Sequence, residues 1–242
     1  MIKKITSGYL LFFCRFRRIG ILFFLFFIFS CKKDTDISVP VDFGYTYFPI
    51  DIGRYVIYEV DSIAYDDIVH PPDTSRYLLK ELIASSFLDN SGRITFRIER
   101  YYKIYNSSIP YDSIPWIGPR VWFANQTTTT AERVEENLRY IKLVFPSSKG
   151  KEWNGNAYNT LDQKNYEILS SDQAELVNST SFDSVVTVLQ SEEKDFIRYI
   201  YEVEKYARGV GLVYKERDSI YDGGTEDTVG YMFKQKIVSY GR

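Results

Sequence analysis

The sequence predicts a mostly β protein: a single antiparallel, strongly curved sheet or open barrel with little helix. Three observations predict this fold class. Aromatic residues make up 17% of the 242 residues, and aromatic side chains favour strands. Apolar and polar residues alternate along many short segments after residue 45, which is the period of a strand with one buried face. A long pattern also occurs twice, near the two ends of this part of the chain.

The strands are expected in the order in which the alternation appears. In residues 93–100, Ile94, Phe96 and Ile98 share one face and charged residues the other, as in a half-buried antiparallel strand. The same reasoning predicts strands at 54–60, 76–87, 138–145, 166–170, 184–190, 196–206, 210–217 and 229–240. Residues 131–137 offer one short helical candidate.

The repeated pattern predicts two related hairpins, 58–85 and 214–239. Asp73-Thr74-x-x-Tyr77-x-x-Lys80-x-x-Ile83-x-Ser85 returns with the same spacing as Asp227-Thr228-x-x-Tyr231-x-x-Lys234-x-x-Ile237-x-Ser239. Each copy follows a strand-like arm that ends in an acidic, turn-prone stretch. We expect these hairpins near the two ends of one sheet. The repeat is too short to indicate a solenoid.

The N-terminus has the layout of a secretory signal. Five basic residues in positions 1–18 precede an 11-residue apolar run, 19–29, whereas a membrane-spanning helix needs about 20 residues. We therefore expect a cleaved signal peptide at 1–30, a flexible lipidated tether at 31–43 and a single mostly β domain at 44–242.

The run ends in Ile28-Phe29-Ser30-Cys31, which resembles the lipobox of bacterial lipoproteins. Residues 47–58 and 206–214, with the lipobox, resemble uncharacterised lipoproteins of the Bacteroidota. The resemblance implies lipidation of Cys31, attachment to a membrane through this N-terminal lipid, and a place in the cell envelope, most often at the outer membrane. It implies no particular activity.

Charge and cysteine content narrow the classes of function. The chain has 30 basic and 32 acidic residues, and with the five basic residues of the signal removed it has 25 and 32, a net charge of −7. Such a body carries no basic footprint for nucleic acid. Its cysteines are Cys14, in the signal, and Cys31, so no disulfide is expected in the mature chain. A protein, glycan or lipid partner stays open.

Asp-Ser or Asp-Thr followed by an aliphatic residue occurs five times. This tripeptide resembles the O-glycosylation acceptor of Bacteroidota glycoproteins, and an acceptor hydroxyl must be accessible. Most of these sites are expected at turns or strand ends, where Asp-Ser pairs also serve simply to start turns. Ser184 is the exception, at a strand start. The candidate acceptors are Ser62, Ser113, Ser184, Ser219 and Thr228.

The sequence shows no catalytic or metal site, and no cofactor is expected. It contains one His, His70, with no ligand spacing around it, and neither a nucleophile elbow nor a phosphate loop. Trp116 and Trp122 lie in a Pro, Gly and aromatic stretch, 111–122, which reads as a loop able to stack on a sugar, although core packing is common for such rings. We expect a non-enzymatic binding or interaction protein. The alternatives are a carrier of an apolar ligand in a curved-sheet cavity, or a sugar-binding or glycan-processing surface protein.

Overall fold

The computed structural model describes residues 41–68, 71–222 and 228–242. These residues form one antiparallel sheet of 12 strands in the order β6-β5-β4-β3-β2-β1-β12-β11-β10-β9-β8-β7. Strands that follow one another in the chain pair with each other, except β6 and β7, which form the two edges, and β1 with β12 joins the two halves. The strands are β1 Tyr55–Tyr65, β2 Asp73–Leu88, β3 Ile94–Ile104, β4 Ile117–Gln126, β5 Thr130–Glu135, β6 Leu138–Val144, β7 Glu152–Asn154, β8 Asn165–Val177, β9 Thr180–Lys194, β10 Arg198–Ala207, β11 Gly211–Asp222 and β12 Thr228–Gly241.

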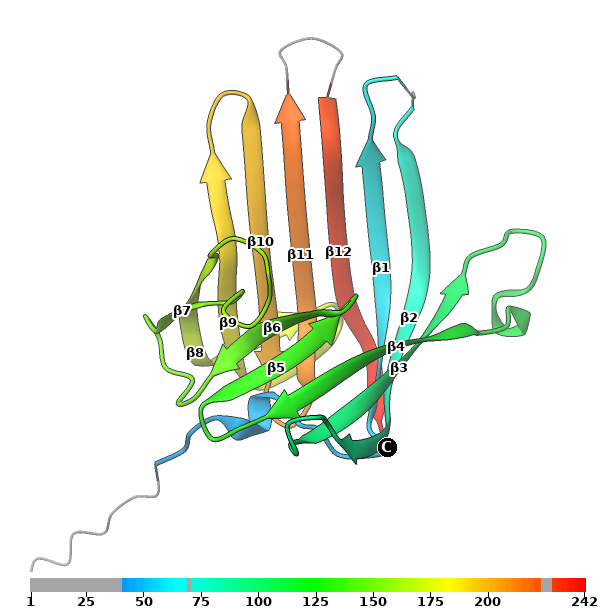
Figure 1. Ribbon diagram of the computed structural model, residues 1–242. Helices are drawn as coiled ribbons and strands as arrows, with labels where there is room; N and C mark the ends of the chain where they lie inside the picture. Colours follow the sequence, from blue (N-terminus) through cyan, green and yellow to red (C-terminus); the bar gives the residue numbers. More distant parts are fainter. Residues whose placement is uncertain (1–40, 69–70, 223–227) are drawn as a thin grey trace, which may run out of the picture. The chain divides into compact units, whose positions relative to one another are not determined.

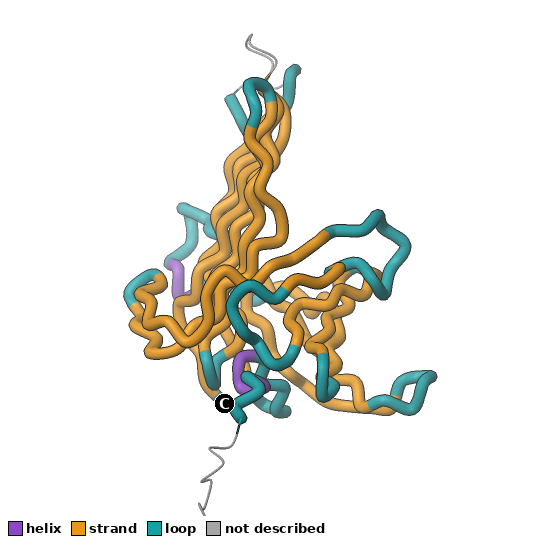
Figure 2. Tube along the Cα trace, turned by 90° about the vertical axis from the view of Figure 1, so that its left-hand side faces the viewer, coloured by secondary structure: helices purple, strands orange, loops and turns teal. Residues whose placement is uncertain are grey.

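The sheet curves until its two ends meet. Strands β3 to β6 cross in front of β1, β11 and β12 (Figure 1). Beyond this crossing, the halves of β1, β2 and β9–β12 continue upward as a broad extension (Figure 1) that is thin when seen edge-on (Figure 2). The Ile141 amide on β6 donates to the Gly155 carbonyl just after β7, at 2.9 Å, and Trp153 Nε1 donates to the Ile141 carbonyl, also at 2.9 Å. The prediction of a single antiparallel, strongly curved sheet or open barrel is confirmed.

The two related hairpins are confirmed, but their expected positions are wrong. β1–β2 and β11–β12 lie side by side at the centre of the sheet, not near its ends. Tyr58 of the first copy pairs with Ile237 of the second. The repeat therefore continues from one hairpin directly into the next along the sheet, and the sheet ends are built by the unrelated middle of the chain.

Two local predictions are also wrong. Residues 131–137, the helical candidate, form β5 and the tight turn into β6. Ala131, Arg133 and Glu135 alternate along β5 and so share one face of this strand. Glu136 and Asn137, which connect β5 to β6, both have positive φ, 47° and 67°, as in the two-residue turns that best suit hairpins. Residues 117–122, taken as loop, belong to β4. Pro119 is tolerated there because the pairing of β3 with β4 is irregular between Arg100 and Tyr102.

Helix is confined to two short 3-10 turns in the described ranges, η2 Tyr45–Tyr47 and η3 Tyr111–Ser113. η2 anchors the entering chain to the sheet. The Tyr47 ring is buried, and its hydroxyl donates to Asp172 at 2.6 Å. Apolar side chains from both halves of the sheet form one core, which includes Tyr58, Leu79, Leu143, Ile168 and Val213.

Candidate functional site

A cavity of about 390 Å³ lies on the inner side of the curved sheet, lined by side chains from β1 to β6 and from β11 and β12. Its size is within the range of small-ligand pockets, roughly 300–1,000 Å³. Six of its lining side chains are aromatic: Tyr77, Tyr102, Trp122, Tyr140, Tyr231 and Phe233. Eight others carry charge: Arg100, Arg120, Arg133, Lys215, Arg217, Glu81, Glu135 and Glu136.

At one side of the cavity, a single buried carboxylate holds two arginines. Glu81 on β2 accepts from Arg133 at 2.6 Å and from Arg100 at 2.9 Å, and both bonds end on the same oxygen, Oε1. Burial raises the pKa of Glu81, but Arg133 and Arg100 outweigh it and leave the pKa below its usual value. Glu81 is therefore ionised at neutral pH and cannot donate a proton there.

A second buried cluster of ion pairs joins the crossing strands β5 and β6 to β10 and β11. Lys142 on β6 lies 2.9 Å from Glu135 and 3.1 Å from Glu204, and Lys215 lies 3.0 Å from Glu204. Burial raises the pKa of Glu135, but Lys142, Lys215 and Arg133 bring it down to about 2. Since these ion pairs link β5 and β6 to β10 and β11, they hold the cavity walls together.

Two buried donors of the cavity wall make no hydrogen bond in the described chain, although Arg133 Nε lies 3.8 Å from Glu135 Oε1 in an ion pair. The Gln235 side chain is 3% exposed and Arg133 is 6% exposed. Neither Gln235 Nε2 nor Arg133 Nε makes a hydrogen bond with any described residue. Buried donors of this kind cost about 1–3 kcal/mol each when left unpaired, and they are rare in native proteins.

The two candidate stacking residues are not brought together. Trp122 lines the cavity, with the Arg100 guanidinium 3.4 Å from its ring centre and its Nε1 donating to Glu136 at 3.1 Å. Trp116 is 36% exposed and does not line the cavity. Its ring lies beside Lys103, whose Nζ is 5.6 Å from the ring centre.

The candidate glycosylation sites differ in surroundings. Ser113 is exposed at the end of η3. Thr228 is half-buried and begins β12. Ser62 and Ser219 lie inside β1 and β11 rather than at the expected turns, and Ser62 lines the cavity.

Ser184 lies in β9, where its hydroxyl is already engaged. It donates to Asp172 at 2.7 Å and accepts from Arg208 at 3.2 Å. Hydrogen bonds from Tyr47, Ser184 and Arg208 lower the pKa of Asp172 to about 2. This cluster fixes η2 and the turn after β10 against β8 and β9. Cys31 and His70 lie outside the described residues.

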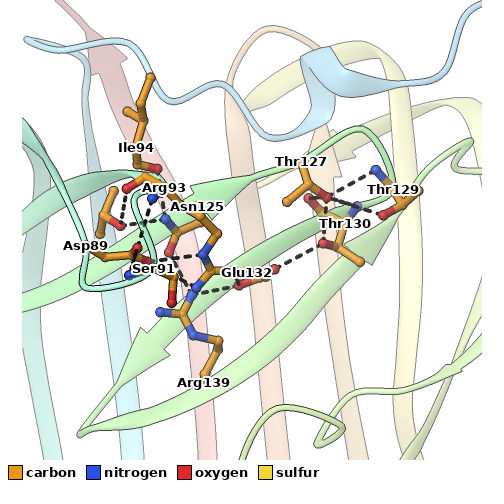
Figure 3. A network of polar contacts seen from close by, with 11 residues as sticks. Asp89, Ser91, Arg93, Ile94, Asn125, Thr127, Thr129, Thr130, Glu132 and Arg139 are labelled. Atoms are coloured by element: carbon orange, nitrogen blue, oxygen red, sulfur yellow. Dashed lines mark hydrogen bonds and ion pairs between the residues drawn. The ribbon is translucent and has the colours of Figure 1, made fainter.

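A third polar network is internally paired (Figure 3), and none of its labelled residues lines the cavity. Arg93 and Arg139 both bond to the buried Glu132, at 3.2 Å and 2.7 Å, and Asn125 accepts from Arg139 at 2.7 Å. Asp89 caps the β2–β3 turn by accepting from the Arg93 amide at 2.9 Å. Through these bonds the buried Glu132 holds the β2–β3 turn against β5 and β6, which accounts for a carboxylate at this position.

The described ranges contain neither a metal-ligand cluster nor a membrane-spanning helix. No group of three or more His, Cys, Asp or Glu side chains there is placed to hold a metal ion. No helix in these ranges is long and apolar enough to pass through a bilayer.

Comparison with known proteins gives weak structural likenesses only. No protein-family model matches the chain, and no curated protein is significantly similar to it. A crystal structure of a candidate lipoprotein from Parabacteroides distasonis aligns with a TM-score of 0.41 and 13% identity, over 81% of this chain and 98% of that one. A candidate exported protein with a YmcC-like fold from Bacteroides fragilis aligns with a TM-score of 0.42 and 11% identity, over 84% and 100%. Neither likeness is strong enough to bear on function.

Proposed function

We propose that this chain is a lipid-anchored protein of the bacterial cell envelope whose β body binds a small ligand, without catalysis, in the cavity under β3 to β6. The observation that carries the binding role is a pair of buried donors that make no hydrogen bond with the described chain, Gln235 Nε2 and Arg133 Nε, in the wall of a cavity of ligand size. A polar ligand that accepts from them would offset their desolvation.

Binding is favoured over glycan hydrolysis by the state of the cavity carboxylates. A glycosidase needs one carboxylic acid whose pKa is raised so that it can protonate the leaving group. Nearby cations instead lower the pKa of both Glu81 and Glu135. These two buried carboxylates serve as partners for cations.

A carrier of apolar ligands is disfavoured by the same residues. Five basic and three acidic side chains line the cavity, and a hydrocarbon would remove them from water without offering a partner. Polar recognition with aromatic support fits this wall better.

The binding role is tested by thermal unfolding with a panel of small molecules: neutral oligosaccharides, anionic sugars, amino acids and fatty acids. We expect at least one polar compound to raise the Tm, because a ligand that binds only the folded state stabilises it. Ser62→Phe should abolish the shift, since Ser62 lines the cavity and a phenyl ring would fill part of it. A shift that survives Ser62→Phe, or no shift with any compound, would contradict cavity binding.

The anchor rests on the sequence around Cys31 and has its own test. Mass spectrometry of the chain purified from its own membranes should give a mature N-terminus at an acylated Cys31. The same spectra report hexose additions, which we expect first at Ser113, the exposed candidate. Cys31→Ala should abolish incorporation of labelled fatty acid, and unchanged labelling of that variant would overturn the anchor.

A further inference from the structure

We propose that the ligand of this cavity is an anionic carbohydrate, that is, a small sugar bearing a carboxylate or a phosphate. This inference rests on the proposed binding function and names its ligand class. It is carried by three features of the cavity wall: its charge, its unpartnered polar groups and its rings.

The charge of the buried cluster is unbalanced. Two groups of ion pairs, around Glu81 and around Lys142, together contain four buried cations and three carboxylates. The cations are Arg100, Arg133, Lys142 and Lys215, and the carboxylates are Glu81, Glu135 and Glu204. Each cation has a carboxylate partner, but the cluster as a whole carries one positive charge in excess where solvent screening is weak.

The adjoining pairs do not remove this excess. Glu202 is shared by Lys164 at 2.8 Å and Arg217 at 3.4 Å. Burial lowers the pKa of Lys215, which the nearby Glu135 and Glu204 only partly offset. An anion in the cavity would stabilise the charged form of this lysine.

Arg120 supplies a further cation at the edge of the cavity. It is exposed, lines the cavity, and makes no ion pair or hydrogen bond with another described residue. Its guanidinium lies 5.3 Å from the centre of the Tyr102 ring, so that the arginine is held over an aromatic face. A planar, always charged guanidinium in this position suits a carboxylate or phosphate oxygen.

The unpartnered polar groups favour a ligand with many oxygens. Gln235 Nε2 and Arg133 Nε offer buried donors. Four tyrosines of the wall, Tyr77, Tyr102, Tyr140 and Tyr231, make no hydroxyl hydrogen bond with another described residue. A hydroxyl both donates and accepts, as does each hydroxyl of a sugar. A simple inorganic anion would use few of these groups.

The rings of the wall supply the remaining feature. The apolar face of a pyranose packs against flat aromatic rings, and Tyr140, Tyr231 and Phe233 are half-buried along the cavity. Trp122 serves differently, because Arg100 covers one face of its indole at 3.4 Å. Tyrosines therefore supply most of the aromatic surface of this wall.

The test is calorimetric titration of the full chain with α-1,4-digalacturonate, with its matched neutral counterpart α-1,4-galactobiose, and with a sugar phosphate, galactose 6-phosphate. We expect digalacturonate or the phosphate to bind at least roughly tenfold more tightly than galactobiose, as for one charge-assisted hydrogen bond. The affinities of digalacturonate and galactose 6-phosphate together show whether the cavity accepts a sugar carboxylate, a sugar phosphate or both.

Two variants locate the effect. Arg120→Ala, at an exposed position, should reduce affinity for the anionic probe about tenfold and leave that for galactobiose unchanged, while Arg120→Lys should restore part of it. Gln235→Met should weaken both sugars. If galactobiose binds as tightly as the anions, or a fatty acid binds instead, the anionic sugar is wrong while the binding function stands. If none of these compounds nor any in the wider panel binds, the binding function itself fails.

Discussion

Gln235 is a residue that costs the ligand-free protein stability and is available to bind a ligand. Its Nε2 is buried in the middle of a β-strand and makes no hydrogen bond with a described residue, although an apolar side chain would fit the strand pattern at that position. Locally unfavourable residues of this kind are expected at functional sites, where a ligand can satisfy them.

Replacing this amide should therefore stabilise the ligand-free protein. Gln235→Met removes an unpaired buried donor at nearly constant volume, and we expect it to raise the free energy of unfolding by about 1 kcal/mol, measured by urea denaturation. Gln190 provides the matched control, because its Nε2 is equally buried and unpartnered but does not line the cavity. Gln190→Met should give the same stabilisation with unchanged ligand binding. A destabilised Gln235→Met would show that the amide has a structural partner.

The charged side chains of the cavity could not be predicted from the sequence. Glu81 lies between Leu79 and Ile83 on one face of β2, and alternation alone shows that this face is buried. Its counterions come from Arg100 and Arg133, on strands β3 and β5, and pairing at such separations depends on the tertiary fold. A charged residue at an inward position of an otherwise apolar strand was the available signal.

At the scale of elements, strand alternation located most strands, and failures arose where turn geometry decided the structure. The Ala-Glu-Arg-Val-Glu-Glu segment of β5 has a helical composition. The positive φ of Glu136 and Asn137 closes a hairpin instead, and burial of Arg133 against Glu81 then outweighs helix propensity. The short β7 carries no pattern of its own and forms by pairing with β8.

The β11–β12 hairpin depends on one glycine. Gly230 has φ of +131°, and a Cβ at this position would clash with the backbone carbonyl oxygen of Ser219. Gly230→Ala should therefore destabilise the fold by more than the conformational strain of about 1–3 kcal/mol. Gly92 is the control, since its φ is +72° and a Cβ added there would meet nothing within 4 Å. Equal losses of unfolding free energy for the two alanine variants would show that the close contact on Ser219 relaxes without cost.

At the scale of the whole body, curvature creates the cavity. The sequence predicted one curved sheet, but it could not predict the strand order. The two hairpins carry the same pattern, and nothing local to either specifies that β1 pairs with β12. That long-range pairing places the repeats at the centre and leaves β3 to β6 free to cross over them.

The buried ion pairs across this crossing should make the fold sensitive to acid. Glu135 has a pKa of about 2 in the folded state against 4.5 for the free group, and the pKa of Glu204 is lowered as well. A depressed carboxylate pKa stabilises the fold above the unfolded value and loses this contribution as the pH falls through the folded value. We therefore expect the urea concentration at the unfolding midpoint to decrease as the pH is lowered from about 4.5 to about 2.

Glu135→Gln should reduce this decrease of the urea midpoint at low pH. Glu136→Gln, which changes the exposed neighbouring carboxylate, should leave the decrease as it is. Since loss of Glu135 leaves Lys142 and Lys215 with a single shared carboxylate, Glu204, the variant should also be less stable at neutral pH, by about 3–5 kcal/mol. The same decrease of the urea midpoint at low pH in both variants would show that other carboxylates, such as Asp172, govern acid unfolding.

The most direct test of ligand binding in the cavity is a crystal structure of the chain grown with the tightest-binding compound of the panel. We expect electron density for that compound within the cavity, with an oxygen in hydrogen-bond distance of Gln235 Nε2 and its charged group near Arg120. A compound bound elsewhere on the sheet, with Gln235 and Arg133 rearranged to pair with the protein itself, would contradict the assignment of this cavity as the binding site.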